Sequence, residues 1–169
     1  MKTLQNTIAI VALATLLFST NILAQDQASS NATVSIHLAK GLSISPIDQS
    51  IDFPEYVAAG NGGGTTTVVP GNARGASFKV NGEAGKSVSV DYDATVLLSN
   101  GTDNLTFTAD VDETGDNSSY SGASSVADGG SVALDGTTGN VYLWIGGSIT
   151  IAAQSAGTYT GTFNFTVAY

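Results

Sequence analysis

The stretch that decides the fold covers residues 144–169 and reads WIGGSITIAAQSAGTYTGTFNFTVAY. From Tyr159 to Tyr169 every odd position is apolar, aromatic or glycine, and the even positions from Thr158 to Thr166 are all Thr or Asn. A period of two is typical of a β-strand with one buried face and one solvated face. Each buried Phe or Val contributes about 1.5–3 kcal/mol, so we expect this stretch to anchor the core. The predicted core residues on it are Trp144, Tyr159, Phe163, Phe165, Val167 and Tyr169.

The first 24 residues follow the order of a secretory signal peptide. Lys2 gives a charged start, an apolar run covers 8–18, and the small residue Ala24 precedes Gln25. This run is shorter than the roughly 20 residues that a membrane-spanning helix needs. We therefore predict a signal peptide at 1–24, export to the periplasm, cell surface or extracellular space, and no membrane span in the mature chain. An uncleaved anchor is the alternative.

The composition describes an acidic chain that is held together by packing. Fourteen Asp and Glu residues stand against five Lys and Arg, which gives a net charge of −9. Such a chain has no electrostatic attraction for nucleic acid or anionic lipid. It contains no Cys, so disulfides do not stabilise it. We predict a flexible mature N-terminus at 25–31 and a single domain at 32–169.

Short alternating segments, separated by Gly, Asn and Pro turns, fill this predicted domain. No apolar pattern at helical spacing lasts ten residues. The sequence therefore predicts an all-β protein, an antiparallel β-sandwich of about nine or ten short strands. The first expected strand lies at 32–38, and its alternation continues until Pro46, which ends it. Residues 76–80 and 88–92 are expected to be the arms of a hairpin. Further strands are expected at 66–69, 95–98, 105–111, 132–134 and 141–145, at 149–151 after a bend at Gly146 and Gly147, and at 159–169.

Three segments resemble a bacterial family of domains of unknown function. They read FKVNGEAGKSVSV at 78–90, IGGSITI at 145–151 and AGTYTGTFNFTVAY at 156–169. The last is similar to the family's closing strand, G-x-Y-x-G-x-F-x-V-x-V-x-Y. The resemblance implies a small exported immunoglobulin-like sandwich and carries no catalytic motif. More distantly, the chain is similar to spore-coat-U-type and chaperone–usher pilin subunits, which polymerise at cell surfaces.

The pilin resemblance implies a donor strand. Ala32, Val34, Ile36 and Leu38 alternate with polar residues, as in a segment that a neighbouring subunit could accept as an added strand. Two departures weaken the comparison. The chain lacks the disulfide of many pilins, and Ala168 stands where pilins often carry Tyr. Pairing of this segment within its own domain is therefore the alternative, and the one that we favour.

Asp110, Asp112 and Asp116 form a candidate calcium site. With Gly115 they partly match a calcium loop, which has acids at its first and third places and Gly at its sixth. The twelfth place is Ser121, which cannot act as a bidentate carboxylate. A solvated acidic turn is the simpler interpretation, and we expect no other cofactor.

No catalytic constellation is evident. His37 is the only histidine, and no G-x-S-x-G motif is present. Asp91 and Asp93 flank Tyr92 on one predicted strand face, but no partner for acid–base sugar chemistry can be named. We therefore predict that the protein is not an enzyme. Trp144 and Tyr142 share a strand face and could stack on a sugar, although a Trp in so apolar a strand is more often part of the core.

The expected function is that of an exported, non-enzymatic structural or adhesive surface protein, similar to a pilus or fimbria subunit. Its partners would be copies of itself or other surface proteins. One alternative is an extracellular carbohydrate- or calcium-binding module. Another is a small outer-membrane β-barrel, because the closing stretch alternates and ends on an aromatic residue. The expected strands are mostly shorter than the roughly nine to eleven residues that a bilayer requires, which favours the sandwich.

Overall fold

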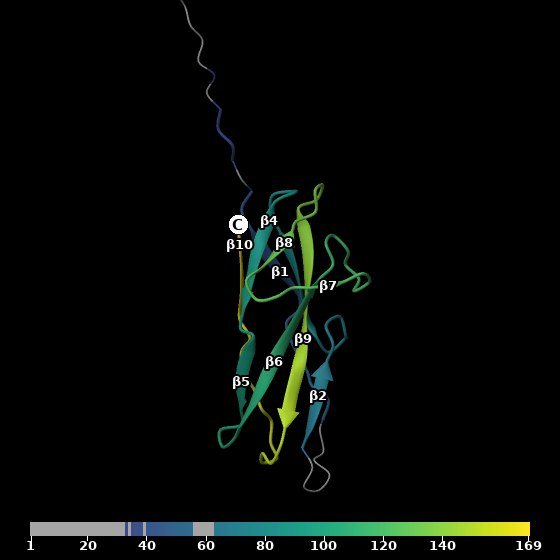
Figure 1. Cartoon of the computed structure of the whole chain (residues 1–169), viewed down its shortest axis with the longest axis vertical. Coiled ribbons are helices and arrows are strands. Elements are labelled where there is room, and N and C mark those ends of the chain that lie inside the picture. The colour runs from purple at the N-terminus through teal and green to yellow at the C-terminus, as the bar shows by residue number, and fades with distance from the viewer. Residues whose placement is uncertain (1–32, 34, 39, 56–62) are drawn as a thin grey trace, which may run out of the picture. The chain divides into compact units, whose positions relative to one another are not determined.

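The structure is a computed structural model that describes residues 33, 35–38, 40–55 and 63–169. Contacts between residues divide the chain into Met1–His37 and Leu38–Tyr169, and every described strand lies in the second unit. Ten strands and no helix are found among the described residues, and all strand pairs are antiparallel (Figure 1). The predicted all-β antiparallel fold is confirmed.

The larger sheet is built around its longest strand, β9 (Asn140–Ile151). One edge of β9 pairs first with β3 and then with β2, and its other edge pairs with β6. Strand β1 pairs with β3, while β5 and β7 pair with β6. These strands are β1 (Ser43–Asp48), β2 (Gly64–Val68), β3 (Ala76–Asn81), β5 (Thr95–Ser99), β6 (Asn104–Glu113) and β7 (Ser124–Ser125).

The smaller sheet has the strand order β10-β4-β8. It consists of β10 (Phe165–Ala168), β4 (Ser87–Tyr92) and β8 (Gly130–Ala133). The chain passes from this sheet to the larger one at Asp93 and Ala94, between β4 and β5. Because alternate residues of each strand face the other sheet, Val88, Val90 and Val132 are buried between the layers.

The buried side chains form two clusters. The main core lies between the two sheets and includes Val80, Leu143 and Ile145, which are almost fully buried. A second cluster lies on β5, the beginning of β6 and the end of β9, and it contains no buried residue of the smaller sheet. Its buried members are Val96, Leu105, Phe107 and Ile149. The smaller sheet therefore covers only one part of the larger one.

The predicted hairpin of 76–80 and 88–92 is wrong. The strands form, but β3 lies in the larger sheet and β4 in the smaller one. The link between them begins at Gly82, where a Cβ atom would lie 2.7 Å from side-chain atoms of Leu134 and Leu42. The link therefore crosses the closely packed end of the sandwich instead of forming a two-stranded ladder.

The sequence also predicts that Pro46 ends a strand and that Gly146 and Gly147 bend the chain between two strands. Both predictions are wrong. Pro46 lies inside β1, an edge strand that pairs on one side only, where the missing N–H of proline is tolerated. Gly146 and Gly147 lie inside a continuous β9 and are buried. A Cβ at Gly146 would lie 2.1 Å from the carbonyl oxygen of Val68, so glycine lets the neighbouring backbone approach.

The closing stretch is only partly a strand. Regular pairing covers Phe165–Ala168, and an isolated bridge joins Thr160 to Ser99. The predicted core residues Tyr159, Phe163, Phe165 and Val167 are half-buried and pack against the two clusters, while Tyr169 is 55% exposed. Trp144 lies on β9, but it is half-buried and alternates with the buried Leu143 and Ile145, so its side chain faces away from the main core.

Candidate functional site

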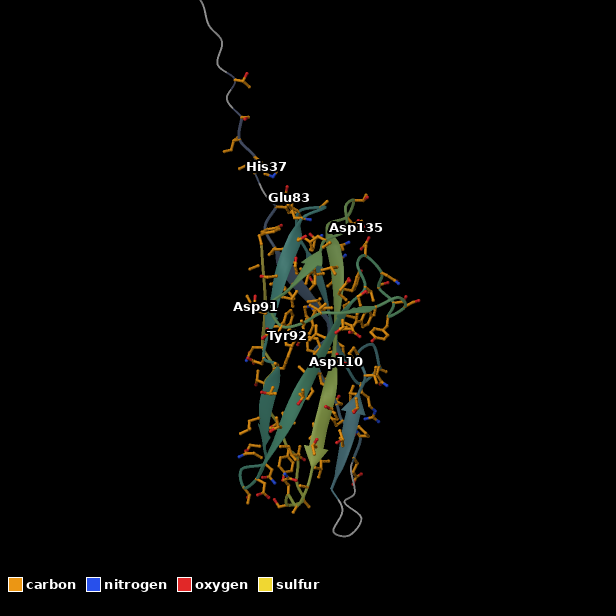
Figure 2. The ribbon with its side chains drawn as sticks, viewed as in Figure 1. His37, Glu83, Asp91, Tyr92, Asp110 and Asp135 are labelled. Carbon is orange, nitrogen blue, oxygen red and sulfur yellow. The ribbon has the colours of Figure 1, made fainter. Side chains whose placement is uncertain are left out.

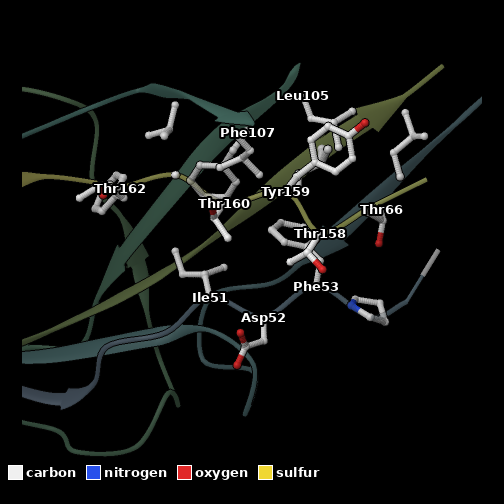
Figure 3. Close-up of a pocket in the computed structure, with 18 of the residues that line it drawn as sticks. Ile51, Asp52, Phe53, Thr66, Leu105, Phe107, Thr158, Tyr159, Thr160 and Thr162 are labelled. Carbon is white, nitrogen blue, oxygen red and sulfur yellow. The ribbon is translucent and has the colours of Figure 1, made fainter. Parts of the chain in front are cut away.

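A groove of about 1210 Å³ opens beside the second cluster. Residues 51–55, here called the first rim, line one side, and residues 154–163, the second rim, line the other. Figure 3 shows Ile51, Asp52 and Phe53 across from Tyr159, Thr160 and Thr162. The groove lies wholly within the unit Leu38–Tyr169.

The floor of the groove is the second cluster. Phe107 lies at its centre and meets one aromatic ring from each rim (Figure 3). The ring of Phe53 lies 5.9 Å from that of Phe107, and the ring of Phe163 lies 6.4 Å from it, both edge-to-face. The other buried floor residues are Val96, Leu105 and Ile149. The floor is therefore an apolar core surface that is covered by side chains of the two rims and not by a strand of the smaller sheet.

The backbone of the rims has few partners. Among the described residues, the first rim makes one backbone hydrogen bond, from the N–H of Asp52 to the carbonyl of Arg74 at 2.8 Å. Thr160 of the second rim exchanges two backbone bonds with Ser99, at 2.9 and 3.1 Å. In the part of the chain that the structure describes, most other N–H and C=O groups of the rims make no backbone hydrogen bond, as at the edge of a sheet.

The second rim is fixed at its beginning by Asp103. Its carboxylate accepts hydrogen bonds from the hydroxyl and the backbone N–H of Ser155, and these bonds lower the pKa of Asp103. The hydroxyl of Tyr159 donates to the carbonyl of Ser155 at 2.8 Å. These contacts fix the position of the first residues of the second rim.

The charged side chains that line the groove are both acidic. Asp52 and Glu55 are exposed on the first rim, and the lining residues include no Lys, Arg or His. An apolar floor beside an acidic rim favours a partner that is apolar on one face and neutral or basic elsewhere.

The three residues of the predicted calcium site are not brought together. The carboxylate of Asp112 accepts a hydrogen bond from the hydroxyl of Tyr120, and that of Asp116 accepts one from the amide of Asn140 at 2.8 Å. No group of three metal-ligating side chains forms among the described residues. Burial and the nearby charge of Asp112 raise the pKa of Asp110. Asp112 and Asp116 thus have structural partners of their own.

The two acids that flank Tyr92 differ in their contacts. Asp91 is exposed on β4, beside Tyr92 (Figure 2). The carboxylate of Asp93 accepts hydrogen bonds from the backbone and side-chain nitrogens of Asn164, at 3.1 and 3.0 Å. Asp93 therefore fastens the closing stretch where the chain changes sheets.

Trp144 belongs to a small aromatic cluster on the outer face of the larger sheet. Its indole N–H donates to the hydroxyl of Thr114 at 2.9 Å, and its ring meets that of Tyr120 edge-to-face at 5.9 Å. Beside it, the ammonium of Lys79 lies 5.8 Å from the ring of Tyr142. These contacts anchor the loop after β6, so the cluster has a structural explanation.

We predict that Tyr120, a member of this cluster, loses its proton at a higher pH than an ordinary tyrosine. The hydrogen bond to Asp112, burial and the nearby carboxylates raise the pKa of Tyr120 to about 12. In the unfolded chain the pKa of Tyr is about 10. The hydrogen bond of Tyr120 therefore stabilises the folded protein fully below pH 10, and this stabilisation is lost as the pH rises to about 12. Urea unfolding should show a stability gap between the wild type and Tyr120→Phe at pH 8 that narrows by pH 11. In Asp112→Asn, the absorbance titration of Tyr120 should shift towards its ordinary pKa. A gap that stays constant with pH would contradict the assignment.

The described part of the predicted donor segment lies outside the sheets. Ser35–Leu38 has no strand assignment, so the predicted strand is absent there. Ile36 is 81% exposed and Leu38 is 82% exposed. Ala32 and Val34 lie outside the described residues.

Comparison with known families gives one match. Residues 49–169, well over half of the chain, match a family model described as Domain of unknown function (DUF4402). The chain belongs to this family. A search of curated proteins finds no match.

Both rims and the floor of the groove lie within the DUF4402 region, whereas Ile36 and Leu38 precede it. None of the strands expected from the sequence covers Ile51, Phe53 or Pro54 of the first rim. The sequence did not reveal the groove, because an alternating pattern does not show which end of a sheet lacks a cover. Among the described residues, no helix has the length and hydrophobicity needed to cross a membrane.

Proposed function

We propose that this DUF4402 protein is an exported, non-enzymatic structural protein of the cell surface whose copies assemble through strand addition. The observation that carries the proposal is the exposure of Ile36 and Leu38, 81% and 82%, in a segment with strand-like alternation. Large apolar side chains exposed together commonly mark an interaction site. The signal-like order of residues 1–24 supports export.

The contacts of the acidic side chains in the sandwich support a non-enzymatic role. The carboxylates of Asp93, Asp103 and Asp112 serve as acceptors that hold loops and the closing stretch in place. Both sheets end in edge strands, among them β1 and β10, which offer backbone groups for pairing with another chain. Both features suit a building block better than a catalyst.

The test is the size of the purified protein as its concentration rises, followed by sedimentation velocity and electron microscopy. The wild type should form larger species at higher concentration. Ile36→Asp should need at least about tenfold more protein to assemble, because a carboxylate would have to enter an apolar site.

Ser35→Asp is the matched control. It adds the same charge one residue earlier, on the other face of an extended segment, and should assemble like the wild type. A wild type that stays monomeric at every concentration, or two variants that behave alike, would contradict the proposal.

A further inference from the structure

The end of the sandwich that the smaller sheet leaves uncovered has space for one more strand. There Phe107 and Ile149 are only 3% and 5% exposed, and the side chains of the two rims cover them in place of a strand of the smaller sheet. The rim backbones are largely unpaired among the described residues, as set out above. An extended segment between the rims could pair with their backbones and place alternate side chains against the half-buried rim rings of Phe53, Tyr159 and Phe163.

We infer that the groove accepts residues 32–38 of a second copy of this chain as an added strand. This inference rests on the proposed function and identifies the accepting site. Seven residues of strand span about 23 Å, and the second rim, 154–163, has ten residues, so the segment fits within the length of the rim. Ala32, Val34, Ile36 and Leu38 would face into the groove, and Thr33, Ser35 and His37 would face outward.

The charges of the two surfaces are complementary. Residues 27–47 contain no Asp or Glu, although the whole chain has fourteen, and they include His37 and Lys40. The groove carries the acidic Asp52 and Glu55 and no basic side chain. A second copy would therefore bring the least acidic part of its chain to an acidic rim, while two sandwich surfaces with the net charge of the chain would repel each other.

Because the chain has no Cys, single cysteines can locate the contact. One full-length variant carries Ser35→Cys, and it is mixed with a second variant that carries Asp52→Cys or Thr162→Cys on a rim (Figure 3). Neighbouring residues of paired strands have Cβ atoms about 4.5–5.5 Å apart, close to disulfide distance. Mild oxidation should give mixed dimers with a rim cysteine at least about tenfold faster than with Thr108→Cys, which is exposed on β6 outside the groove. Equal rates would overturn the inference.

A blocking variant tests the groove independently. Thr66 of β2 lines the groove, whereas its neighbour Thr67 is exposed and does not. Thr66→Trp should fill the site and weaken assembly at least about tenfold, and Thr67→Trp should leave assembly unchanged. Matching circular dichroism spectra and melting temperatures would show that both variants fold. A folded Thr66→Trp that assembles like the wild type would overturn the inference.

A labelled peptide of residues 29–41 separates this inference from the proposed function. The full-length protein should bind the peptide, Thr66→Trp should not, and an Ile36→Asp peptide should bind at least about tenfold more weakly. If the protein stays monomeric but binds the peptide in this way, the proposed assembly fails and the accepting site stands. If the peptide does not bind, or if a fatty acid binds in the groove and the peptide cannot displace it, the inference is overturned.

Discussion

Replacing Leu143 by Ala is expected to lower the free energy of unfolding by about 3–5 kcal/mol, within the upper part of the range for buried Leu→Ala changes. Leu143 has no exposed surface and lies on β9, with β3 on one side and β6 on the other. Its neighbours belong to several strands of both sheets, which cannot all move inward to fill the space. Small domains are stable by about 5–15 kcal/mol, so this one change would remove a large share.

Urea unfolding followed by tryptophan fluorescence can measure this loss, because Trp144 is the only tryptophan. Leu97→Ala provides the control, since it removes the same atoms from a side chain on β5 that is 63% exposed. We expect Leu97→Ala to change stability by less than about 0.5 kcal/mol. Similar losses for the two variants would mean that Leu143 does not lie at the centre of the core.

The sequence predicted which residues are buried better than it predicted their partners. The alternation of Val88 and Val90 correctly gave the buried face of β4. The same pattern cannot tell whether the neighbouring segment pairs with that strand or faces it across the core, since both arrangements bury alternate residues. This ambiguity produced the hairpin prediction for two strands that lie in different sheets.

Pro46 and Gly146 were misread for a related reason. Proline ends a strand only where both edges must pair, and the sequence does not show that β1 is an edge strand. Glycine suggests a bend, but in β9 it makes room for the backbone at Val68. In both cases a contact between distant segments overrides the local preference.

The candidate site was predictable only in part. The alternation of Ile36 with its neighbours indicated a segment that could act as an added strand. In the structure, Ile36 and Leu38 of this segment are exposed. The groove was missed because it depends on how far the smaller sheet extends over β5, β6 and β9. Phe53, Phe107 and Phe163 come from distant parts of the chain, and no sequence spacing links them.

Gly147→Ala is expected to lower the free energy of unfolding by about 3 kcal/mol or more, because it combines backbone strain with overpacking. Gly147 has a φ of +154°, which L side chains rarely adopt. A Cβ atom there would lie 2.3 Å from the carbonyl oxygen of Thr108 and 2.4 Å from a ring carbon of Phe107. The first contact is with the backbone of β6, which is paired with β9 and cannot yield without loss of hydrogen bonds.

Gly136→Ala is the matched control for this change. Nothing lies within 4 Å of a Cβ at Gly136, and its φ is not among the positive values, so the change should alter stability by less than about 0.5 kcal/mol. Urea unfolding of the two variants measures the difference. Since Phe107 forms the centre of the groove floor, a folded Gly147→Ala protein should also bind the peptide of residues 29–41 more weakly than Gly136→Ala does. Wild-type stability in Gly147→Ala would show that β6 and β9 are not packed as closely as the structure places them.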